Sequence, residues 1–344
     1  MKPPARAAGR SIHILNTGGT ISYGAPSEGG ATLTFSPDRI LDGLGIPGRA
    51  PYREVLRKGS VDMGPADWQA VGAAVRDAVA EGADGVVVFH GTDTMAYTAA
   101  ALSLMLSGLP VPVVLTGSMR PGGAADSDAP RNVRDAVCVA ATADLAEVCV
   151  VFSGDEAGTG GVILRGSRVR KIHSGALNAF VTPNHPPLGF VEGATIRYGQ
   201  GARVPRGPRG GVGFFPEIDP DVCLIRYHPG CTAASVAGVL ARAHGAVIEG
   251  TGLGHLPTEG GILEAIRESG KPVVLVSACW QGGVRLGLYD IDRQILAVEN
   301  LIPGHDLTPE AALVKLMWVL GRERTVAGVR TRMQAPVAGD LTPV

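Results

Sequence analysis

The sequence has no excess of charge of one sign and no long basic run. Its 344 residues carry 31 Lys and Arg against 32 Asp and Glu, which gives a formal net charge of -1. Nucleic-acid binding depends largely on neutralising phosphates with lysine and arginine, so this balance argues against direct nucleic-acid binding. No apolar run is long enough to span a bilayer, which argues against a membrane protein.

Cysteine is scarce, and its spacing excludes several kinds of site. No two of the five cysteines have the close spacing of a zinc ribbon or a redox pair. The odd count and the apolar surroundings of three of them indicate reduced, buried thiols, as in a cytoplasmic protein. The basic residues 1–10 precede only a short apolar stretch, which is typical of a strand and not of a signal peptide.

Motifs of cofactor-dependent and metal-dependent enzymes are also missing. There is no Gly-Lys-Ser/Thr phosphate loop, no pair of metal-binding histidines at helical spacing and no Gly-x-Ser-x-Gly elbow. Gly250–His255 is rich in glycine but lacks the spacing of the dinucleotide fingerprint and a matching acidic residue. We therefore expect no cofactor and no metal, and we interpret Gly250–His255 as a loop at the edge of a site.

What the sequence does contain is a regular alternation of strand and helix patterns. In the first two thirds, apolar runs predict strands at Ser11–Asn16, Gly85–His90, Val111–Gly117 and Glu147–Ser153. Helical patterns lie between them at Asp67–Glu81, Thr94–Ser107 and Asp128–Ala141. This order predicts an α/β fold with a mainly parallel sheet that is covered on both faces.

A second, smaller α/β domain is predicted after a stretch rich in Gly, Pro and Arg. That stretch, residues 199–220, is interpreted as a linker between a domain at 1–198 and a domain at 221–344. The second domain is expected to be flavodoxin-like. Its strands are expected at Asp221–Tyr227, Ala246–Gly250 and Pro272–Ala278, and its helices at Ala233–Ala243, Gly260–Ser269 and, as a last amphipathic helix, Glu310–Gly321.

Two threonine-bearing turns stand at the ends of apolar runs. The first is Thr17-Gly18-Gly19-Thr20 and the second is His90-Gly91-Thr92-Asp93-Thr94. Open α/β folds build their sites at the carboxyl ends of strands, so both turns are expected at such an edge. Two hydroxyls and a carboxylate there indicate nucleophilic attack on a carbonyl without a metal, with backbone N–H groups beside Thr20 as an oxyanion pocket.

Each of these residues also has a plainer structural interpretation. Thr20 could be a simple turn residue, and Asp93 or Thr94 could cap the following helix. We interpret His90 as a hydrogen-bonded structural histidine rather than a general base. Lys171 lies in a basic stretch that is typical of a solvated face, although a desolvated lysine near a threonine could act as a base.

Taken together, the motifs resemble those of the asparaginase/glutaminase family, the threonine amidohydrolases of bacterial type. Thr17–Ile21 resembles the first family signature, and His90–Met95 resembles the second. Gly59–Met63 and Leu115–Pro121 are similar to further family segments, and the resemblance runs over nearly the whole chain.

The resemblance implies a role for each matching residue. Thr20 would be the primary nucleophile, and Lys171 would activate Thr92, the second active threonine. Asp93 would bind the α-amino group of the substrate, and Ser60 its α-carboxylate. The reaction would run through an acyl-enzyme ester that water hydrolyses, with ammonia released in the first half. The family also implies a homodimer or tetramer with sites at a subunit interface.

Two departures from the family pattern concern substrate identity. A tyrosine usually follows the first signature, but Gly29–Pro37 holds none and Leu33 falls near its place. Tyr23 is the only aromatic hydroxyl nearby and is our candidate for substrate binding. The residue after Ser60 is often polar in the family, whereas Val61 cannot form a hydrogen bond through its side chain.

Part of the chain also resembles the D subunit of the archaeal-type glutamyl-tRNA amidotransferase, a glutaminase that supplies ammonia to a partner. The resemblance lies in Gly250–His255 and Glu310–Gly321. That protein has a further domain before its first signature, whereas a strand is expected here already at Ser11, so we expect a free-standing cytoplasmic L-asparaginase. The alternatives are such a glutaminase subunit, an amidohydrolase for a modified asparagine-like amide, and a silent α/β binding protein.

Overall fold

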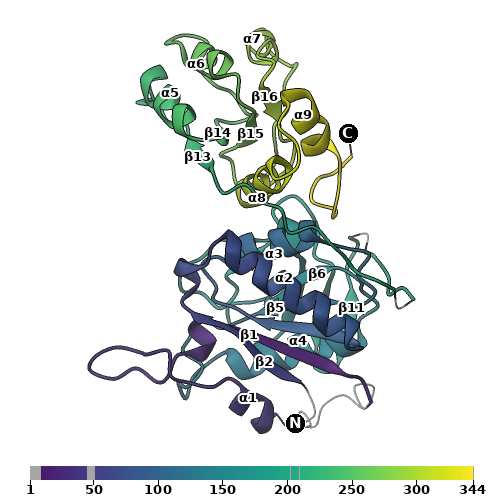
Figure 1. Cartoon of the computed structure of the whole chain (residues 1–344). Coiled ribbons are helices and arrows are strands. Elements are labelled where there is room, and N and C mark those ends of the chain that lie inside the picture. Colours follow the sequence, from purple (N-terminus) through teal and green to yellow (C-terminus); the bar gives the residue numbers. More distant parts are fainter. Residues whose placement is uncertain (1–8, 45–50, 202, 209, 344) are drawn as a thin grey trace. The chain divides into compact units, whose positions relative to one another are not determined.

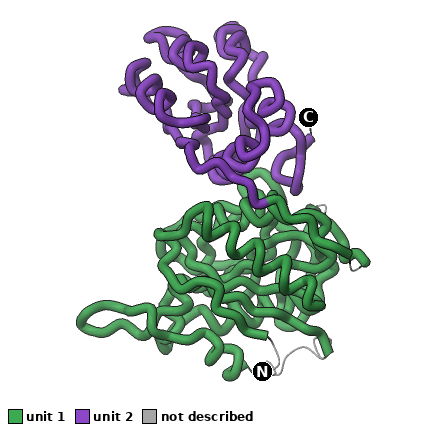
Figure 2. The backbone as a smooth tube through the Cα atoms, in the orientation of Figure 1, with its two compact units in different colours: residues 1–215 green, residues 216–344 purple. Residues whose placement is uncertain are grey.

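The computed structural model of the protein describes residues 9–44, 51–201, 203–208 and 210–343. The chain divides into two compact units, Met1–Phe215 and Pro216–Val344 (Figure 2). Residues 1–8, 45–50, 202, 209 and 344 of the predicted domains and linker lie outside the described residues.

An eight-stranded sheet forms the centre of the first unit, in the order β11-β10-β7-β6-β5-β3-β1-β2 (Figure 1). Its parallel strands are β1 (Ile12–Gly18), β2 (Tyr52–Lys58), β3 (Gly85–Phe89), β5 (Val113–Thr116) and β6 (Val148–Ser153). Its antiparallel strands are β7 (Gly161–Arg165), β10 (Gly189–Glu192) and β11 (Thr195–Tyr198). The predicted mainly parallel sheet is confirmed, and the antiparallel edge is an addition to it.

Helices cover both faces of this sheet. On one face, α2 (Pro65–Ala80) and α3 (Met95–Met105) pack against Val86 and Val88 of β3. On the other, α1 (Asp38–Gly43) and α4 (Ala129–Thr142) pack against Val87 and Phe89. Because consecutive strand residues point to opposite faces, the unbroken apolar run of β3 is buried on both sides.

Short pairings complete the first unit. The strand β4 (Leu106–Ser107) pairs with β12 (Gly213–Phe214), and β8 (Arg170–Lys171) pairs with β9 (Phe180–Val181). The β12 strand belongs to the predicted linker. Arg206, also in that segment, donates hydrogen bonds of 2.6 Å to the carbonyls of Ala140 and Ala143 at the end of α4. This part of the 199–220 segment is therefore attached to the first unit.

The second unit is a four-stranded parallel sheet with helices, which confirms the predicted smaller α/β domain. Its strands, in sheet order, are β13 (Val222–Arg226), β14 (Gly245–Gly250), β15 (Val273–Ser277) and β16 (Leu301–Pro303). The helices α5 (Ala233–Arg242), α6 (Ile262–Ser269) and α7 (Asp292–Leu296) share one apolar cluster with the sheet. The helix α8 (Pro309–Leu320) packs against β13, β14 and β15 outside that cluster.

The prediction for the last helix was wrong in two respects. A further helix, α9 (Val326–Gln334), follows α8, and nine of the twelve residues of α8 are buried, so α8 is not amphipathic. The reason is that α8 also contacts the chain that follows it: the buried Lys315 donates hydrogen bonds to the carbonyls of Met333 and Ala335. Among the described residues, no helix combines the length and the apolar character that crossing a membrane requires.

Candidate active site

Three turns meet at one edge of the large sheet, where the neighbouring strands β2, β1 and β3 end. The Gly19 amide donates a hydrogen bond of 3.0 Å to the Lys58 carbonyl at the end of β2. A Cβ atom added at Gly19 would lie 2.2 Å from the Cα of Gly91, and one added at Gly91 would lie 2.5 Å from the Cβ of Ser60. Only glycine permits such close backbone contact. Residues Thr20, Thr92 and Ser60 are therefore held in or beside touching turns.

Thr20 begins a tight turn of 3-10 helix, Thr20–Ser22. The two glycines before it have positive φ angles, 96° at Gly18 and 80° at Gly19, which side chains with a Cβ rarely adopt. The Thr20 carbonyl accepts hydrogen bonds of 3.1 Å from the amides of Tyr23 and Gly122. The turn is thus held by the sheet edge on one side and by the Gly122 loop on the other.

Lys171 links the second threonine to the neighbouring carboxylate. Its Nζ donates a hydrogen bond of 2.8 Å to Thr92 Oγ1 and lies 2.7 Å from Asp93 Oδ1. Thr92 is buried, the Lys171 side chain is 16% exposed and the Asp93 side chain is 60% exposed. Lys171 is therefore not a freely solvated surface charge. A lysine in this position can polarise the threonine hydroxyl or exchange a proton with it.

Ser60 is buried and its turn is tied to the second threonine motif. Thr94 Oγ1 donates a hydrogen bond of 2.7 Å to the Ser60 carbonyl. Thr94 precedes α3, but its side chain does not cap that helix, so the capping interpretation was wrong for this residue. Helix capping and a long-range bond require the same hydroxyl, and the sequence alone does not distinguish them.

Tyr23 and Val61 occupy different positions beside the Ser60 turn. A Cβ atom added at Gly59 would lie 3.6 Å from the Tyr23 hydroxyl, so this hydroxyl stands beside the backbone next to Ser60. Val61 is 72% exposed. The structure therefore brings the phenol to the turn, while Val61 extends into solvent and leaves room for a longer polar side chain.

His90 has the structural role that was predicted for it. It is fully buried, its Nδ1 lies 2.7 Å from the Gly91 carbonyl, and its Nε2 lies 2.9 Å from Thr98 Oγ1. A carbonyl only accepts, so Nδ1 carries the proton and Nε2 accepts from Thr98. Burial lowers the pKa of His90 to about 4. The imidazole is thus neutral with both nitrogens engaged, which makes it unsuitable as a general base.

The Gly250–His255 loop is fixed within the second unit. His255 Nε2 lies 3.0 Å from Asp292 Oδ1, at ion-pair distance. The other oxygen of this fully buried carboxylate accepts hydrogen bonds from the amides of residues 287, 288 and 289. The His255 ring also contacts the edge of Tyr289, with ring centres 5.5 Å apart. The loop is therefore a rigid turn at the carboxyl end of β14.

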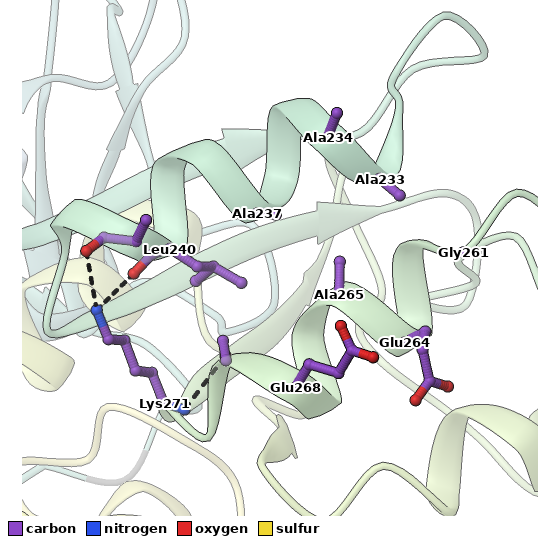
Figure 3. A pocket seen from close by; sticks show the side chains of 11 residues that line it. Ala233, Ala234, Ala237, Leu240, Gly261, Glu264, Ala265, Glu268 and Lys271 are labelled. Carbon is purple, nitrogen blue, oxygen red and sulfur yellow. Dashed lines mark hydrogen bonds between the residues drawn. The ribbon is translucent and has the colours of Figure 1, made fainter.

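The second unit has a groove between α5 and α6. The groove has a volume of about 560 Å³ and is lined mainly by small side chains, together with Glu264, Glu268 and Lys271 (Figure 3). Lys271 Nζ donates a hydrogen bond of 2.6 Å to the Leu240 carbonyl at the end of α5. The hydroxyl of Ser269, which also lines the groove, donates a hydrogen bond of 2.7 Å to the Ile266 carbonyl, and we assign the groove no part in amide hydrolysis.

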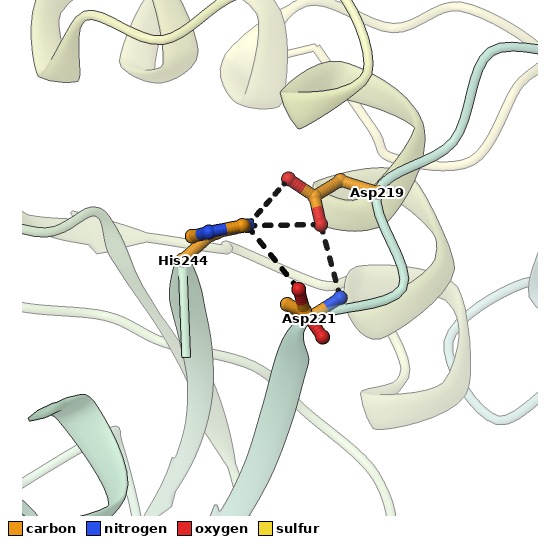
Figure 4. Close-up of side chains that lie close together, drawn as sticks. All are labelled: Asp219, Asp221 and His244. Carbon is orange, nitrogen blue, oxygen red and sulfur yellow. Dashed lines mark hydrogen bonds and ion pairs between the residues drawn. The ribbon is translucent and has the colours of Figure 1, made fainter. Parts of the chain in front are cut away.

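Asp219, Asp221 and His244 form a compact cluster at the start of the second unit (Figure 4). His244 Nδ1 lies 2.9 Å from Asp219 Oδ2, and Arg324 also pairs with Asp219. Burial raises the pKa of Asp219, but hydrogen bonds from the Asp221 amide, Arg324 and His244 outweigh it and lower the pKa. The carboxylate already has Arg324 and His244 as partners, and we assign the cluster a structural role at the start of β13.

Comparisons with known proteins agree with this geometry. The family model for the N-terminal domain of asparaginases matches residues 11–203, and the glutaminase/asparaginase C-terminal domain matches residues 221–333. An L-asparaginase of Thermococcus kodakarensis is 40% identical over 339 residues, covering 96% of this chain and 98% of that protein. The D subunit of the glutamyl-tRNA(Gln) amidotransferase of Halobacterium salinarum is 38% identical, covering 96% and 79%.

A solved structure gives the same result. The thermostable L-asparaginase from Thermococcus kodakarensis superposes with a TM-score of 0.88 at 38% identity and covers 97% of this chain and all of that one. The chain therefore belongs to the asparaginase family. It is an asparaginase-type amidohydrolase.

Proposed function

We propose that the protein is an L-asparaginase, which hydrolyses L-asparagine to L-aspartate and ammonia through a threonyl acyl-enzyme. The observation that carries the proposal is the contact of Lys171 with both Thr92 and Asp93, beside the turn that holds Thr20. Family membership and the 40% identical L-asparaginase support the same substrate.

In the proposed reaction, the Thr20 hydroxyl adds to the side-chain amide carbonyl of the substrate. The hydroxyl proton passes to the leaving nitrogen, the C–N bond breaks, and ammonia departs while an ester forms on Thr20. Thr92 and Lys171 are proposed to transfer protons during this reaction. Backbone amides near Thr20 are proposed to stabilise the oxyanion that forms from the substrate carbonyl. Water attacks the ester, releases aspartate and restores the Thr20 hydroxyl.

The amino-acid end of the substrate is proposed to bind at Asp93 and Ser60. Asp93 Oδ1 is paired with Lys171. The second oxygen of this exposed carboxylate can accept a hydrogen bond from the α-ammonium group of the substrate. Ser60 is proposed to contact the α-carboxylate. Tyr23, whose hydroxyl stands beside Gly59, is proposed to contact the substrate in place of the missing loop tyrosine.

The active form is proposed to be a cytoplasmic dimer or tetramer. The second unit exposes the large apolar side chains of Trp280, Leu288 and Tyr289 by 51%, 56% and 56% within one segment between β15 and α7. Exposed apolar groups of this size favour contact with another protein surface. All five cysteines are free thiols, as expected in a reducing compartment.

A glutaminase is the second candidate, because the chain is also 38% identical to the D subunit of an amidotransferase. Ammonia release from L-asparagine and L-glutamine by the purified chain distinguishes the two, with Thr20→Ala as the blank for contaminating activity. We expect asparagine to have the higher kcat/KM. A higher value for glutamine would favour the second candidate, and no release from either would favour a modified amide or a silent protein.

A further inference from the structure

Two buried polar side chains lie before and at the end of the turn that carries Thr20. Asn16 lies near the end of β1 and is 1% exposed, and Ser22 ends the 3-10 turn and is also 1% exposed. Asn16 shares its face of the strand with Ile12 and Ile14, which belong to an apolar layer of the core. An amide in this position needs a reason beyond packing.

Asn16 joins the two sides of the turn through one atom. Its Oδ1 accepts a hydrogen bond of 3.2 Å from the Gly18 amide and one of 3.3 Å from Ser22 Oγ. A backbone N–H only donates, so the atom facing it is the oxygen, and this fixes the orientation of the side-chain amide. The residues bridged in this way, Gly18 and Ser22, lie before and after Thr20.

Burying the Asn16 amide costs free energy that an apolar side chain at the same position would not cost. The Asn16 Nδ2 is buried and has no hydrogen-bond partner among the residues that the structure describes. A buried donor without a partner is unfavourable, and an apolar residue of similar size would not have one. What asparagine provides here, and an apolar residue would not, is the Oδ1 atom with its two hydrogen bonds.

These two hydrogen bonds connect Gly18 and Ser22 across the turn that carries Thr20. Gly18 and Gly19 both have positive φ angles, and glycine has more conformational freedom than any other residue. We propose that Asn16 is a positioning residue that holds Thr20 for attack. This inference rests on the proposed function, in which Thr20 is the nucleophile. A displacement of a reacting group by about 1 Å can cost roughly 10²-fold in rate.

Two substitutions at one position separate positioning from stability. Asn16→Asp keeps an oxygen acceptor for Gly18 and Ser22 but places an acidic group in the core, whereas Asn16→Ala removes the acceptor. We expect Asn16→Ala to lower kcat at least tenfold with KM within threefold. Asn16→Asp should keep a higher kcat than Asn16→Ala although its Tm is no higher. A purely structural role would make kcat follow Tm.

Two further variants separate loss of the Asn16 hydrogen bonds from general destabilisation of the protein. Ser22→Ala removes one of the two bonds, and we expect a kcat between those of the parent and Asn16→Ala. Asn300→Ala is the matched control: Asn300 is a buried asparagine of the second unit whose Nδ2 donates 2.6 Å and 2.8 Å bonds to the carbonyls of Ile266 and Lys271. It should lower Tm and leave kcat within twofold.

Amide hydrogen exchange of the peptide covering Thr17–Ser22 gives a readout that does not depend on activity. We expect exchange there to rise at least tenfold in Asn16→Ala and to stay unchanged in Asn300→Ala. The inference is overturned if exchange is unchanged, if Asn16→Ala and Ser22→Ala keep kcat within twofold, or if Asn16→Asp loses as much kcat as Asn16→Ala. A parent enzyme without asparagine hydrolysis would instead count against the proposed function, and the exchange result would still stand.

Discussion

The ammonium group of Lys171 lies 2.8 Å from the hydroxyl of Thr92, although 79 positions separate the two residues in the chain. Lys171 lies in β8, which pairs with β9, and Thr92 lies in the turn that follows β3. The contact turns a basic stretch of sequence into part of a candidate proton-transfer system, and it makes Lys171 the first residue to test.

Lys171→Met should lower kcat for asparagine about 10²–10⁴-fold, because a positioned base or acid contributes roughly that factor. Methionine has a similar length, so no cavity is expected. Lys271→Met makes the same chemical change between α6 and β15 of the second unit, where Lys271 Nζ donates to the Leu240 carbonyl, and it should keep activity within twofold. If Lys171→Met stays within twofold and its pH profile does not move, Lys171 has no part in the reaction.

Thr20→Ala should abolish turnover while Tm and circular dichroism stay close to those of the parent. Loss of the nucleophile leaves only electrostatic catalysis, and alanine fits a turn of small residues. Mass spectrometry after rapid acid quenching of the parent with substrate should reveal an ester on the Thr20 peptide. Retention of more than a tenth of the parent ammonia release would show that another residue is the nucleophile.

Val61→Gln should lower KM for asparagine roughly 2- to 10-fold, because one added hydrogen bond contributes about 0.5–1.5 kcal/mol. Val61 is 72% exposed, so the longer side chain fits without repacking. Val61→Leu, which adds size without a hydrogen bond, is the control and should leave KM unchanged. A KM that is unchanged or raised in Val61→Gln would mean that Val61 does not limit binding of the free amino acid.

Trp280→Glu should weaken self-association, because it places a charge in the exposed apolar segment of the second unit. Light scattering with activity measured across dilution should show an active dimer or tetramer for the parent and a shift to smaller species for the variant. Val337→Glu, at a side chain that is 47% exposed elsewhere, provides the matched change. A parent that is a fully active monomer at every concentration would contradict the prediction.

The stability of the protein should fall as the pH drops from about 6.5 to about 4, in part because of His90. Its pKa is lowered from 6.5 to about 4 by burial, so in this window the unfolded chain binds a proton that the folded chain does not. One pKa unit corresponds to about 1.4 kcal/mol, so the loss is about 3 kcal/mol. Above pH 6.5 both states are neutral and the group has no effect.

Urea unfolding of the parent and of His90→Gln at pH 7 and pH 4 measures this contribution. The variant removes the titrating group, so its stability should fall less between the two pH values than that of the parent. Equal losses would mean that His90 is protonated in the folded protein, and its hydrogen bonds to Gly91 and Thr98 would then need a different assignment.

Burial on both faces made some strands predictable from the sequence, but it was not sufficient for all of them. The run Val86–Phe89 is apolar at every position because helices cover both faces of the sheet, so its local pattern was sufficient. The edge strand β2, Tyr52–Lys58, is partly exposed and contains four charged residues, and no strand was predicted there. The antiparallel strands β10 and β11 are short and partly exposed and were missed as well. The antiparallel strand β7 was also missed although all five of its residues are buried.

For the site, the sequence by itself determined which side chains stand at the ends of β1 and β3, because a turn must follow each buried strand and its residues are read directly. Only the tertiary structure decided which of them touch. Whether Lys171 meets Thr92 and whether Thr94 caps a helix or bonds to Ser60 depend on contacts that no local pattern encodes. Hydrogen bonds of this kind form only when the packed sheet brings distant segments within about 3 Å.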